Sequence, residues 1–222
     1  MSDAPLPTNE SVKEQLLWVA QEMLRSGLVE GTAGNCAARL PDGNAVLTPS
    51  SLDYLEMTLD DLVVCDLDGT VVEGHRSPTT EKALHLSALR LYPEINATMH
   101  CHAKFATMFA LTRQPVPAVI EEFDIFVGGD VEVADYKVTG SDELADEVAS
   151  RVARKAAVLM ANHGLFAVGK DPKQVLHVAH LIERTAEIVW GARAIGEVVP
   201  LPDSVNAQFS SYYRYGRTGS FD

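Results

Sequence analysis

Two histidines one residue apart, His100 and His102, are well suited to bind a metal ion. They follow a short apolar run, and in an extended backbone their side chains would point the same way, because side chains alternate along a strand. Imidazole is the commonest protein ligand for zinc-class cations, but such a pair needs one or two further nitrogen or oxygen ligands. The alternative is that two histidines merely end a strand near solvent. The metal hypothesis therefore depends on partners elsewhere in the chain.

Two other residues are candidates for those partners. His163 follows the continuous apolar run of residues 156–161, which is typical of a buried strand. Glu81 follows Ser77 and Pro78, which predict the N-cap and first residue of a helix. In the first turn of that helix a carboxylate is also favoured by the helix dipole alone. Three imidazoles and one carboxylate are a suitable ligand set for Zn²⁺, and a carboxylate able to leave the metal would open a position for substrate.

Two loops rich in small residues have the composition of anion-binding loops. Residues 31–35 and 48–51 both combine hydroxyl groups with backbone N–H donors. Glycine lets a backbone approach a ligand closely or adopt a positive φ, so such loops can form an anion nest. Thr79 and Thr80 would add donors at the positive end of a helix. A turn that simply needs flexibility is the alternative explanation for either loop.

The composition argues against some classes of partner. The chain has 222 residues, 46% of them hydrophobic, which suits one globular domain with a real core. A formal net charge of -13 argues against nucleic acid or an anionic membrane surface, because binding either needs clustered Lys and Arg. Three cysteines without a C-x-x-C pair fit a reducing compartment, and the first residues lack the pattern of a secretory signal. We therefore expect a soluble, cytoplasmic protein.

The pattern of polar and apolar residues predicts alternating helices and strands. Residues 1–10 contain two prolines and are expected to form a flexible arm, after which Ser11 and Glu14 form a capping box that opens a helix. His85, one helical turn after Glu81, is interpreted as a helix or interface residue and not as a ligand. Further helices are predicted over residues 78–92, 104–112, 142–154 and 172–195. Further strands are predicted over residues 45–47, 62–66, 70–72, 97–102, 131–136, 156–161 and 165–168.

Five short motifs, taken in order and spacing, resemble the class II aldolase/adducin family over roughly residues 11–202. They are Gly31-Thr-Ala-Gly-Asn35, Thr48-Pro-Ser50, Ser77-Pro-Thr-Thr-Glu81, His100-Cys-His102 and Asn162-His-Gly164. The resemblance implies a three-layer α/β fold in which helices flank a central, mainly antiparallel sheet. It also implies a homotetramer with active sites between neighbouring subunits. Residues 11–202 would form the family domain, and the tail 203–222 would contribute to an active site or an interface.

The resemblance also implies roles for individual residues. Glu81, His100, His102 and His163 take the family's metal-ligand places, and Glu81 is also its catalytic carboxylate. One Zn²⁺ per subunit is expected, or another divalent transition metal such as Mn²⁺ or Co²⁺. A small phosphorylated sugar would be the substrate. The pocket for its phosphate would be formed by Thr32, Asn35, Ser50, Ser51, Thr79 and Thr80.

The sequence departs from the fuculose-phosphate aldolases of that family at the position of Glu121, where they have a tyrosine that assists catalysis from a neighbouring subunit. Tyr215 is the likeliest counterpart of their C-terminal tyrosine. The expected activity is reversible aldol cleavage of a ketose 1-phosphate to dihydroxyacetone phosphate and an aldehyde, with Glu81, Glu121 and Tyr215 as catalytic residues. The alternatives are a pentulose-phosphate 4-epimerase, a sugar-phosphate dehydratase or decarboxylase, and an adducin-like interaction module. The intact ligand set argues against the last.

Overall fold

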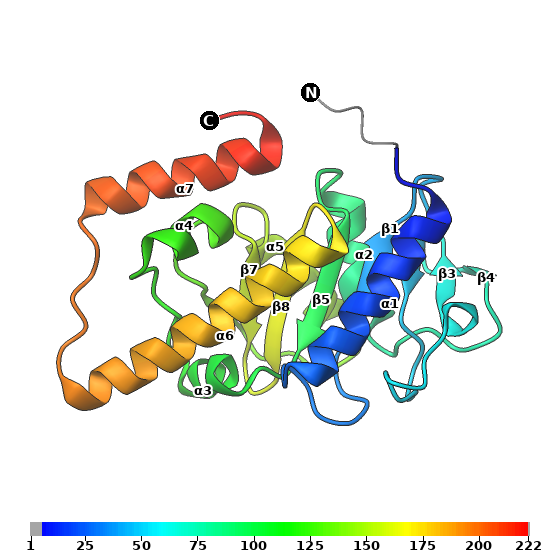
Figure 1. The fold of residues 1–222 in the computed structure, drawn as a ribbon, viewed down its shortest axis with the longest axis horizontal. Helices are drawn as coiled ribbons and strands as arrows, with labels where there is room; N and C mark the ends of the chain where they lie inside the picture. Colours follow the sequence, from blue (N-terminus) through cyan, green and yellow to red (C-terminus); the bar gives the residue numbers. More distant parts are fainter. Residues whose placement is uncertain (1–5, 222) are drawn as a thin grey trace.

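The computed structural model describes residues 6–221, so residues 1–5 of the predicted N-terminal arm lie outside it, and residues 9–10 of that arm are helical. Seven α-helices and one 3₁₀ helix, Leu59–Asp61, accompany an eight-stranded sheet in this part of the chain (Figure 1). The strands are β1 Asn35–Arg39, β2 Ala45–Leu47, β3 Val63–Cys65, β4 Val71–Glu73, β5 Ala97–Cys101, β6 Val133–Ala134, β7 Ala157–Met160 and β8 Gly164–Gly169. The helices are α1 Asn9–Arg25, α2 Lys82–Leu91, α3 Lys104–Thr112, α4 Glu121–Val127, α5 Asp142–Arg151, α6 Pro172–Ile195 and α7 Asp203–Thr218.

The sheet is mainly antiparallel. Its strand order is β4-β3-β2-β1-β5-β8-β7-β6, and only the pairing of β6 with β7 is parallel. The strands β1, β5 and β8 are therefore central neighbours, with Asn35 opposite His100 and His100 opposite Phe166. This register places the end of β5 beside the start of β8. The strand β8 begins immediately after the turn that carries His163.

Helices cover both faces of the sheet, as the fold resemblance implied. Alternate side chains of β1, β2, β3, β7 and β8 enter two separate hydrophobic clusters, as the period of 2 requires. Met99 and Cys101 face the layer of α1, α3, α4 and α6, whereas Phe166 and Val168 face the layer of α2 and α5. In Figure 1, α1 and α6 cross in front of the sheet and α2 and α5 lie behind it. The result is the expected three-layer α/β arrangement.

Several predicted elements are confirmed and two helix starts are wrong. The helix α3 spans the predicted residues, Ser141 caps α5, and Asp171 caps α6. The helix α1, however, starts at Asn9, because the capping box joins Thr8 to Ser11 and not Ser11 to Glu14. The helix α2 starts only at Lys82. The residues before it cannot be helical because they are extended and pair with residues 48–50 through two backbone hydrogen bonds.

The C-terminal tail contains a helix that the sequence pattern did not predict. None of the residues of α7 is buried, and the helix packs against α4, which was also not predicted. Arg217 anchors α7 by donating hydrogen bonds to the carbonyl oxygens of Val152 and Lys155 at 2.7 and 3.0 Å. Between residues 6 and 221, no helix combines the length and the apolar character needed to cross a bilayer.

Candidate active site

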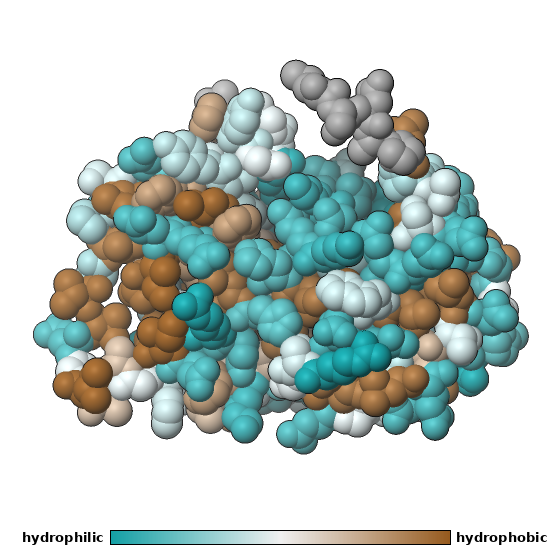
Figure 2. Space-filling model, in the orientation of Figure 1, coloured by the Kyte–Doolittle hydropathy of each residue, from teal (hydrophilic) through white to brown (hydrophobic). Residues whose placement is uncertain are grey.

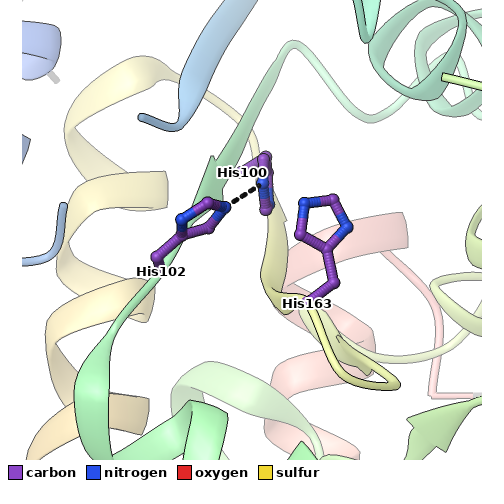
Figure 3. Close-up of side chains that lie close together, drawn as sticks. All are labelled: His100, His102 and His163. Atoms are coloured by element: carbon purple, nitrogen blue, oxygen red, sulfur yellow. Dashed lines mark hydrogen bonds between the residues drawn. The ribbon is translucent and has the colours of Figure 1, made fainter. Parts of the chain in front are cut away.

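His100, His102 and His163 lie together at the end of β5 (Figure 3). One ring nitrogen from each comes within 4.8 Å of the others, and the Nε2 atoms of His100 and His102 are 3.0 Å apart. The ring centroids of His100 and His163 are 4.5 Å apart. Such a cluster of imidazoles, brought from two separate segments of the chain, is an arrangement that suits a divalent metal ion.

The sheet fixes the direction of His100. This side chain is fully buried on the α2 face, and its Nδ1 donates to the carbonyl oxygen of Leu165 at 3.0 Å. The hydrogen bond leaves the Nε2 lone pair free to face the other imidazoles, as in many histidine metal ligands. His102 comes just after the strand ends, immediately before α3. The carboxylate of Glu183 holds the start of α3 by accepting hydrogen bonds from the N–H groups of Phe105 and Ala106, both at 2.9 Å.

His163 is carried by the tight turn between β7 and β8. Asn162, the residue before it, has a φ of 55°, and Arg113, at the end of α3, has a φ of 59°. A hydrogen bond from the Arg113 guanidinium to Oδ1 of Asn162 joins these two residues, both in the left-handed region. On the other side of the histidine, a Cβ atom at Gly164 would collide with the carbonyl oxygen of Cys101. The turn therefore needs this glycine and is held in place by Arg113.

Burial keeps two of the three imidazoles neutral. It lowers the pKa of His100 well below the usual value, and the nearby His163 and His102 lower that pKa further. Burial also lowers the pKa of His102, again with a contribution from His163. Neutral imidazole is the form that binds a metal, so His100 and His102 are ready for a cation at neutral pH.

Glu81 brings a carboxylate to the same place. It lies at the N-cap position of α2 and is almost fully buried. Its Oε2 is 3.5 Å from Nε2 of His100, and its Oε1 is 3.7 Å from Nε2 of His163. Oε1 is buried and accepts no hydrogen bond in the described part of the chain. An orphaned buried oxygen among neutral imidazoles is costly unless something positive lies beside it, so these residues fit a divalent cation.

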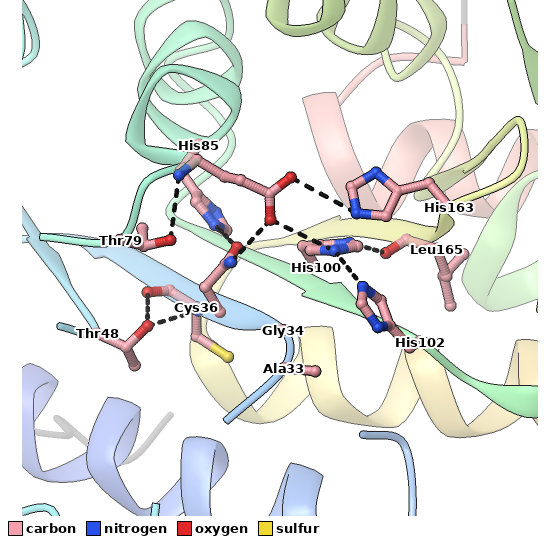
Figure 4. A network of polar contacts seen from close by, with 12 residues as sticks. Ala33, Gly34, Cys36, Thr48, Thr79, His85, His100, His102, His163 and Leu165 are labelled. Carbon is pink, nitrogen blue, oxygen red and sulfur yellow. Dashed lines mark hydrogen bonds and ion pairs between the residues drawn. The ribbon is translucent and has the colours of Figure 1, made fainter. Parts of the chain in front are cut away.

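A line of hydrogen bonds leads from Glu81 away from the histidines (Figure 4). Nδ2 of Asn35 donates to Oε2 of Glu81 at 2.9 Å, and Oδ1 of Asn35 lies 2.6 Å from Nε2 of His85. Nδ1 of His85 lies 2.7 Å from the hydroxyl of Thr98. His85 is thus a fully buried polar residue with both ring nitrogens in use. It is not part of the metal cluster, as the sequence interpretation held.

The two loops expected to bind phosphate lie side by side. The N–H of Ser50 donates to the carbonyl oxygen of Ser77, and the N–H of Thr79 donates to that of Thr48, at 3.0 and 3.1 Å. In the structure of residues 6–221, three backbone N–H groups of the predicted pocket have no hydrogen-bond partner, and they belong to Thr32, Ser51 and Thr80. Ser51 has a φ of 57°. The side chain of Asn35, by contrast, is engaged at both ends.

Glu121 and Tyr215 lie elsewhere on the same subunit. Glu121 is the first residue of α4 and is exposed, and Tyr215 on α7 is 51% exposed and stacks on Phe221. Between residues 6 and 221 no hydrogen bond, ion pair or ring contact joins either residue to Glu81 or to the three histidines. Within one subunit the fold therefore brings together the predicted metal ligands but not these two candidates.

Sequence reasoning missed the residues that hold the site in place. Arg113 has no motif around it, and its link to the site follows only from packing of α3 beside the β7–β8 turn. For His85 a signal existed, because it is four residues after Glu81 and so near it along the helix. Spacing alone does not show that Asn35 lies between the two.

Comparison with known proteins supports the same interpretation. Residues 14–190 match the model of the family described as "Class II Aldolase and Adducin N-terminal domain". The chain is 36% identical to the 5-deoxy-D-ribulose 1-phosphate aldolase of Bacillus thuringiensis serovar kurstaki, over 86% of this chain and 90% of that protein. It is 31% identical to the L-ribulose-5-phosphate 4-epimerase UlaF of Salmonella paratyphi B, over 87% and 91%.

The fold agrees with a solved structure as well. An L-fuculose 1-phosphate aldolase superposes with a TM-score of 0.86 at 33% identity, covering 91% of this chain and 96% of that one. The chain therefore belongs to the class II aldolase and adducin family, and its activity is that of an aldolase-type lyase.

Proposed function

We propose that this chain catalyses the reversible aldol cleavage of a ketose 1-phosphate to dihydroxyacetone phosphate and an aldehyde. The observation that carries the proposal is the buried Glu81 carboxylate, 3.5 and 3.7 Å from two of three clustered imidazoles and with one oxygen unpartnered. Relatives whose names give ketose 1-phosphates as substrates support the substrate class.

His100, His102 and His163, with Glu81, would hold one Zn²⁺, Mn²⁺ or Co²⁺ per subunit. When bound, such a cation supplies a Lewis acid that offsets the negative charge developing on the substrate as the C3–C4 bond breaks. Aldolases of this class depend on a metal, and the donor set here has the composition such a site requires.

Glu81 would act as the general acid and base of the reaction. Its carboxylate would take a proton from C3 of dihydroxyacetone phosphate in the direction of synthesis and return it in the direction of cleavage. The unpartnered Oε1 is the atom available for this transfer, because Oε2 accepts the hydrogen bond from Asn35. Burial of the carboxylate excludes water, which would otherwise quench a carbanion.

The phosphate would lie between the two paired loops. The free N–H groups of Thr32, Ser51 and Thr80 suit an anion, and the hydroxyls of Ser50 and Thr79 would add to them. Backbone and hydroxyl donors can bind a phosphate without basic side chains, which agrees with the acidic composition of the chain.

The aldehyde end would be completed by a neighbouring subunit. A second base must handle the proton of the C4 hydroxyl, and Glu121 or Tyr215 from an adjacent chain are the proposed groups. Both are exposed on the monomer, as a contribution to a partner's site requires. The proposed assembly is a homotetramer, which size determination by light scattering tests directly.

Exposed apolar side chains support self-association. Hydrophobic residues gather on the left of Figure 2, where Figure 1 shows the end of α6 and the link to α7. Large exposed hydrophobic residues in this part of the chain are Trp190, Ile195 and Val199. Apolar groups exposed together in this way are characteristic of protein interfaces. Three free, buried cysteines further support the proposal that the enzyme works in the cytoplasm.

A screen of ketose 1-phosphates, with detection of released dihydroxyacetone phosphate, tests the activity. The substrates should include 5-deoxyribulose 1-phosphate and fuculose 1-phosphate. The variant Glu81→Gln should keep its metal through the three histidines but turn over roughly 10²–10⁴-fold more slowly, as expected for loss of a general acid and base. Unchanged turnover in this variant would exclude the proposed role of Glu81.

The relative named as a 4-epimerase makes that activity the second candidate. An epimerase would interconvert pentulose 5-phosphates and release no dihydroxyacetone phosphate. Incubation with ribulose 5-phosphate and xylulose 5-phosphate, followed by separation of the epimers, distinguishes the two activities.

A further inference from the structure

Three buried side chains continue from Glu81 into the interior, and the reaction proposed above gives them no task. They are Asn35, His85 and Thr98, with exposures of 6%, 0% and 1%. Asn35 comes from β1, His85 from α2 and Thr98 from β5, so the line joins three elements. A polar group is stable in such a position only when its hydrogen bonds are made, and here each link is 2.6 to 2.9 Å long.

The partners determine the direction of every hydrogen bond in this line. Nδ2 of Asn35 donates to the carboxylate oxygen of Glu81, so the Asn35 amide turns its oxygen toward His85. An amide oxygen also only accepts, so Nε2 of His85 must carry a proton. The lone pair on Nδ1 then accepts from the hydroxyl of Thr98.

This pattern requires a neutral imidazole, with one nitrogen as donor and the other as acceptor. The environment agrees, because burial lowers the pKa of His85 to about 3. A charged ring would present two donors. The hydroxyl of Thr98 would then have to accept a hydrogen bond from Nδ1 instead of donating one.

We propose that His85 is a positioning residue, which holds the Asn35 amide in the one orientation that donates to Glu81 and thereby aims the carboxylate at the reacting carbon. The proposal rests on the role of Glu81 proposed above. A flipped Asn35 would place its oxygen against the carboxylate and its NH₂ against the N–H of His85, and both contacts are repulsive. As long as the proton of His85 lies on Nε2, this side chain therefore opposes the flipped amide.

The proposal also changes the role expected for Asn35. The family resemblance implied that this residue binds the substrate phosphate. In the structure both ends of its amide are engaged, the NH₂ with Glu81 and the oxygen with His85. We therefore infer that the Asn35 side chain orients the general base, Glu81. The phosphate would be bound by the two loops without this side chain.

The kinetic test uses variants along one helix. His85→Leu removes the donor to Asn35, and kcat should fall about 10- to 100-fold, the scale on which misplacement of a catalytic group acts. KM, bound metal and inhibition by inorganic phosphate should stay as in the wild type. His85→Gln, whose amide can donate near the place of Nε2, should recover much of the activity.

A matched control and a folding check keep the result interpretable. Ser87→Ala, on the same helix, removes a buried hydroxyl that has no hydrogen-bond partner among residues 6–221, so its kcat should match the wild type. Circular dichroism and metal content should show that all variants are folded. Wild-type kcat in a folded His85→Leu would overturn the proposal.

Asn35→Ala distinguishes the two roles of that residue. If Asn35 positions Glu81, kcat falls as in His85→Leu and the inhibition constant of inorganic phosphate is unchanged. If Asn35 instead binds the phosphate, that inhibition constant rises and kcat is less affected. The second result would overturn the assignment of Asn35.

A spectroscopic measurement tests the geometry without any substrate. The ¹⁵N shifts of histidine-labelled holoenzyme at neutral pH should show His85 protonated at Nε2 and not at Nδ1, and Asn35→Ala should shift its Nε2–H signal. Protonation at Nδ1 alone, or at both nitrogens, would overturn the proposal. The two proposals can also fail separately. If the wild type releases no dihydroxyacetone phosphate, the proposed activity is wrong. If His85 is nevertheless protonated at Nε2, the orientation of Glu81 by Asn35 is still supported.

Discussion

The two ends of the proposed active site are built in different ways. At the metal end, Glu81 and His100 are buried against the sheet, and hydrogen bonds fix both of them. At the aldehyde end, Glu121 and Tyr215 are exposed on the short helix α4 and the peripheral helix α7. A buried side chain with a fixed partner has one orientation, whereas an exposed side chain has several.

Under the proposed mechanism, this difference would separate the residues of the chemical step from those of substrate specificity. Strands and their hydrogen bonds hold catalytic groups more accurately than surface helices do, so the groups common to the reaction belong on the sheet. Side chains that determine specificity for the aldehyde could differ between relatives on α4 and α7 without disturbing the core. Relatives named for different sugar phosphates share this fold, which agrees with that division.

The largest effect should come from a metal-end histidine. His102→Ala removes one of the three imidazoles, so the purified variant should contain almost no divalent metal, against about one ion per subunit in the wild type. Turnover should fall by more than the roughly 10²–10⁴-fold of a lost general base, since the whole site is affected. Metal analysis by mass spectrometry checks this, with the exposed His177→Ala as the control. Full occupancy in His102→Ala would remove His102 from the site.

A smaller effect on metal binding is expected from substitution of Arg113, which holds the turn that carries His163. Arg113→Ala removes the hydrogen bond to Asn162, so the free protein should bind its metal about 10- to 100-fold more weakly. Competition with a chelator measures this affinity. Arg25→Ala, which loses surface contacts with Glu22 and Gln21 on its own helix, is the matched control. Equal chelator sensitivity in the two variants would show that the turn is rigid without Arg113.

The third prediction concerns stability and pH at the metal end. The folded-state pKa of His85, about 3, lies below the unfolded value near 6.5, so below about pH 6.5 the unfolded chain binds a proton that the folded chain does not. The resulting stability is present above pH 6.5 and is lost as the pH falls toward 3. Between pH 6 and 4 the free energy of unfolding should fall more steeply in the metal-free wild type than in His85→Leu, by about 1.4 kcal/mol per pH unit. Urea titrations at several pH values measure this difference, and parallel slopes would contradict it.

The smallest effect is expected at the aldehyde end. Glu121→Gln should leave metal content and phosphate inhibition intact, while kcat/KM changes unequally between aldehydes with and without a hydroxyl group. The change should stay below about tenfold when Tyr215 supplies the second base, because Glu121 then only contacts the hydroxyl group of the aldehyde. Relative rates on hydroxylated and deoxy substrates test this, with Glu122→Gln, the next residue of α4, as the control. Identical ratios in wild type and variant would exclude Glu121 from substrate contact.

Local rules were enough to predict the parts of this protein that depend on neighbours in sequence. Alternation along an apolar strand placed His100 and His102 on one side, and the continuous run before His163 was correctly predicted as a buried strand. Helix α6 was predicted with its Asp171 cap, since a capping residue followed by proline is a strong signal. The motifs also identified the family, because their order along the chain is itself a property of sequence.

Contacts between distant segments decided the rest. Glu81 precedes α2, and does not lie in its first turn, because residues 77–79 pair with a loop some thirty positions earlier. The link from Glu81 through Asn35 to His85 exists only because β1, α2 and β5 are packed together. The helices α4 and α7 were missed since their stability comes from packing on each other and on the core, and isolated helices of such length are marginal in water. The sequence determined which groups can do the chemistry, and the tertiary structure decided which of them meet and in what orientation.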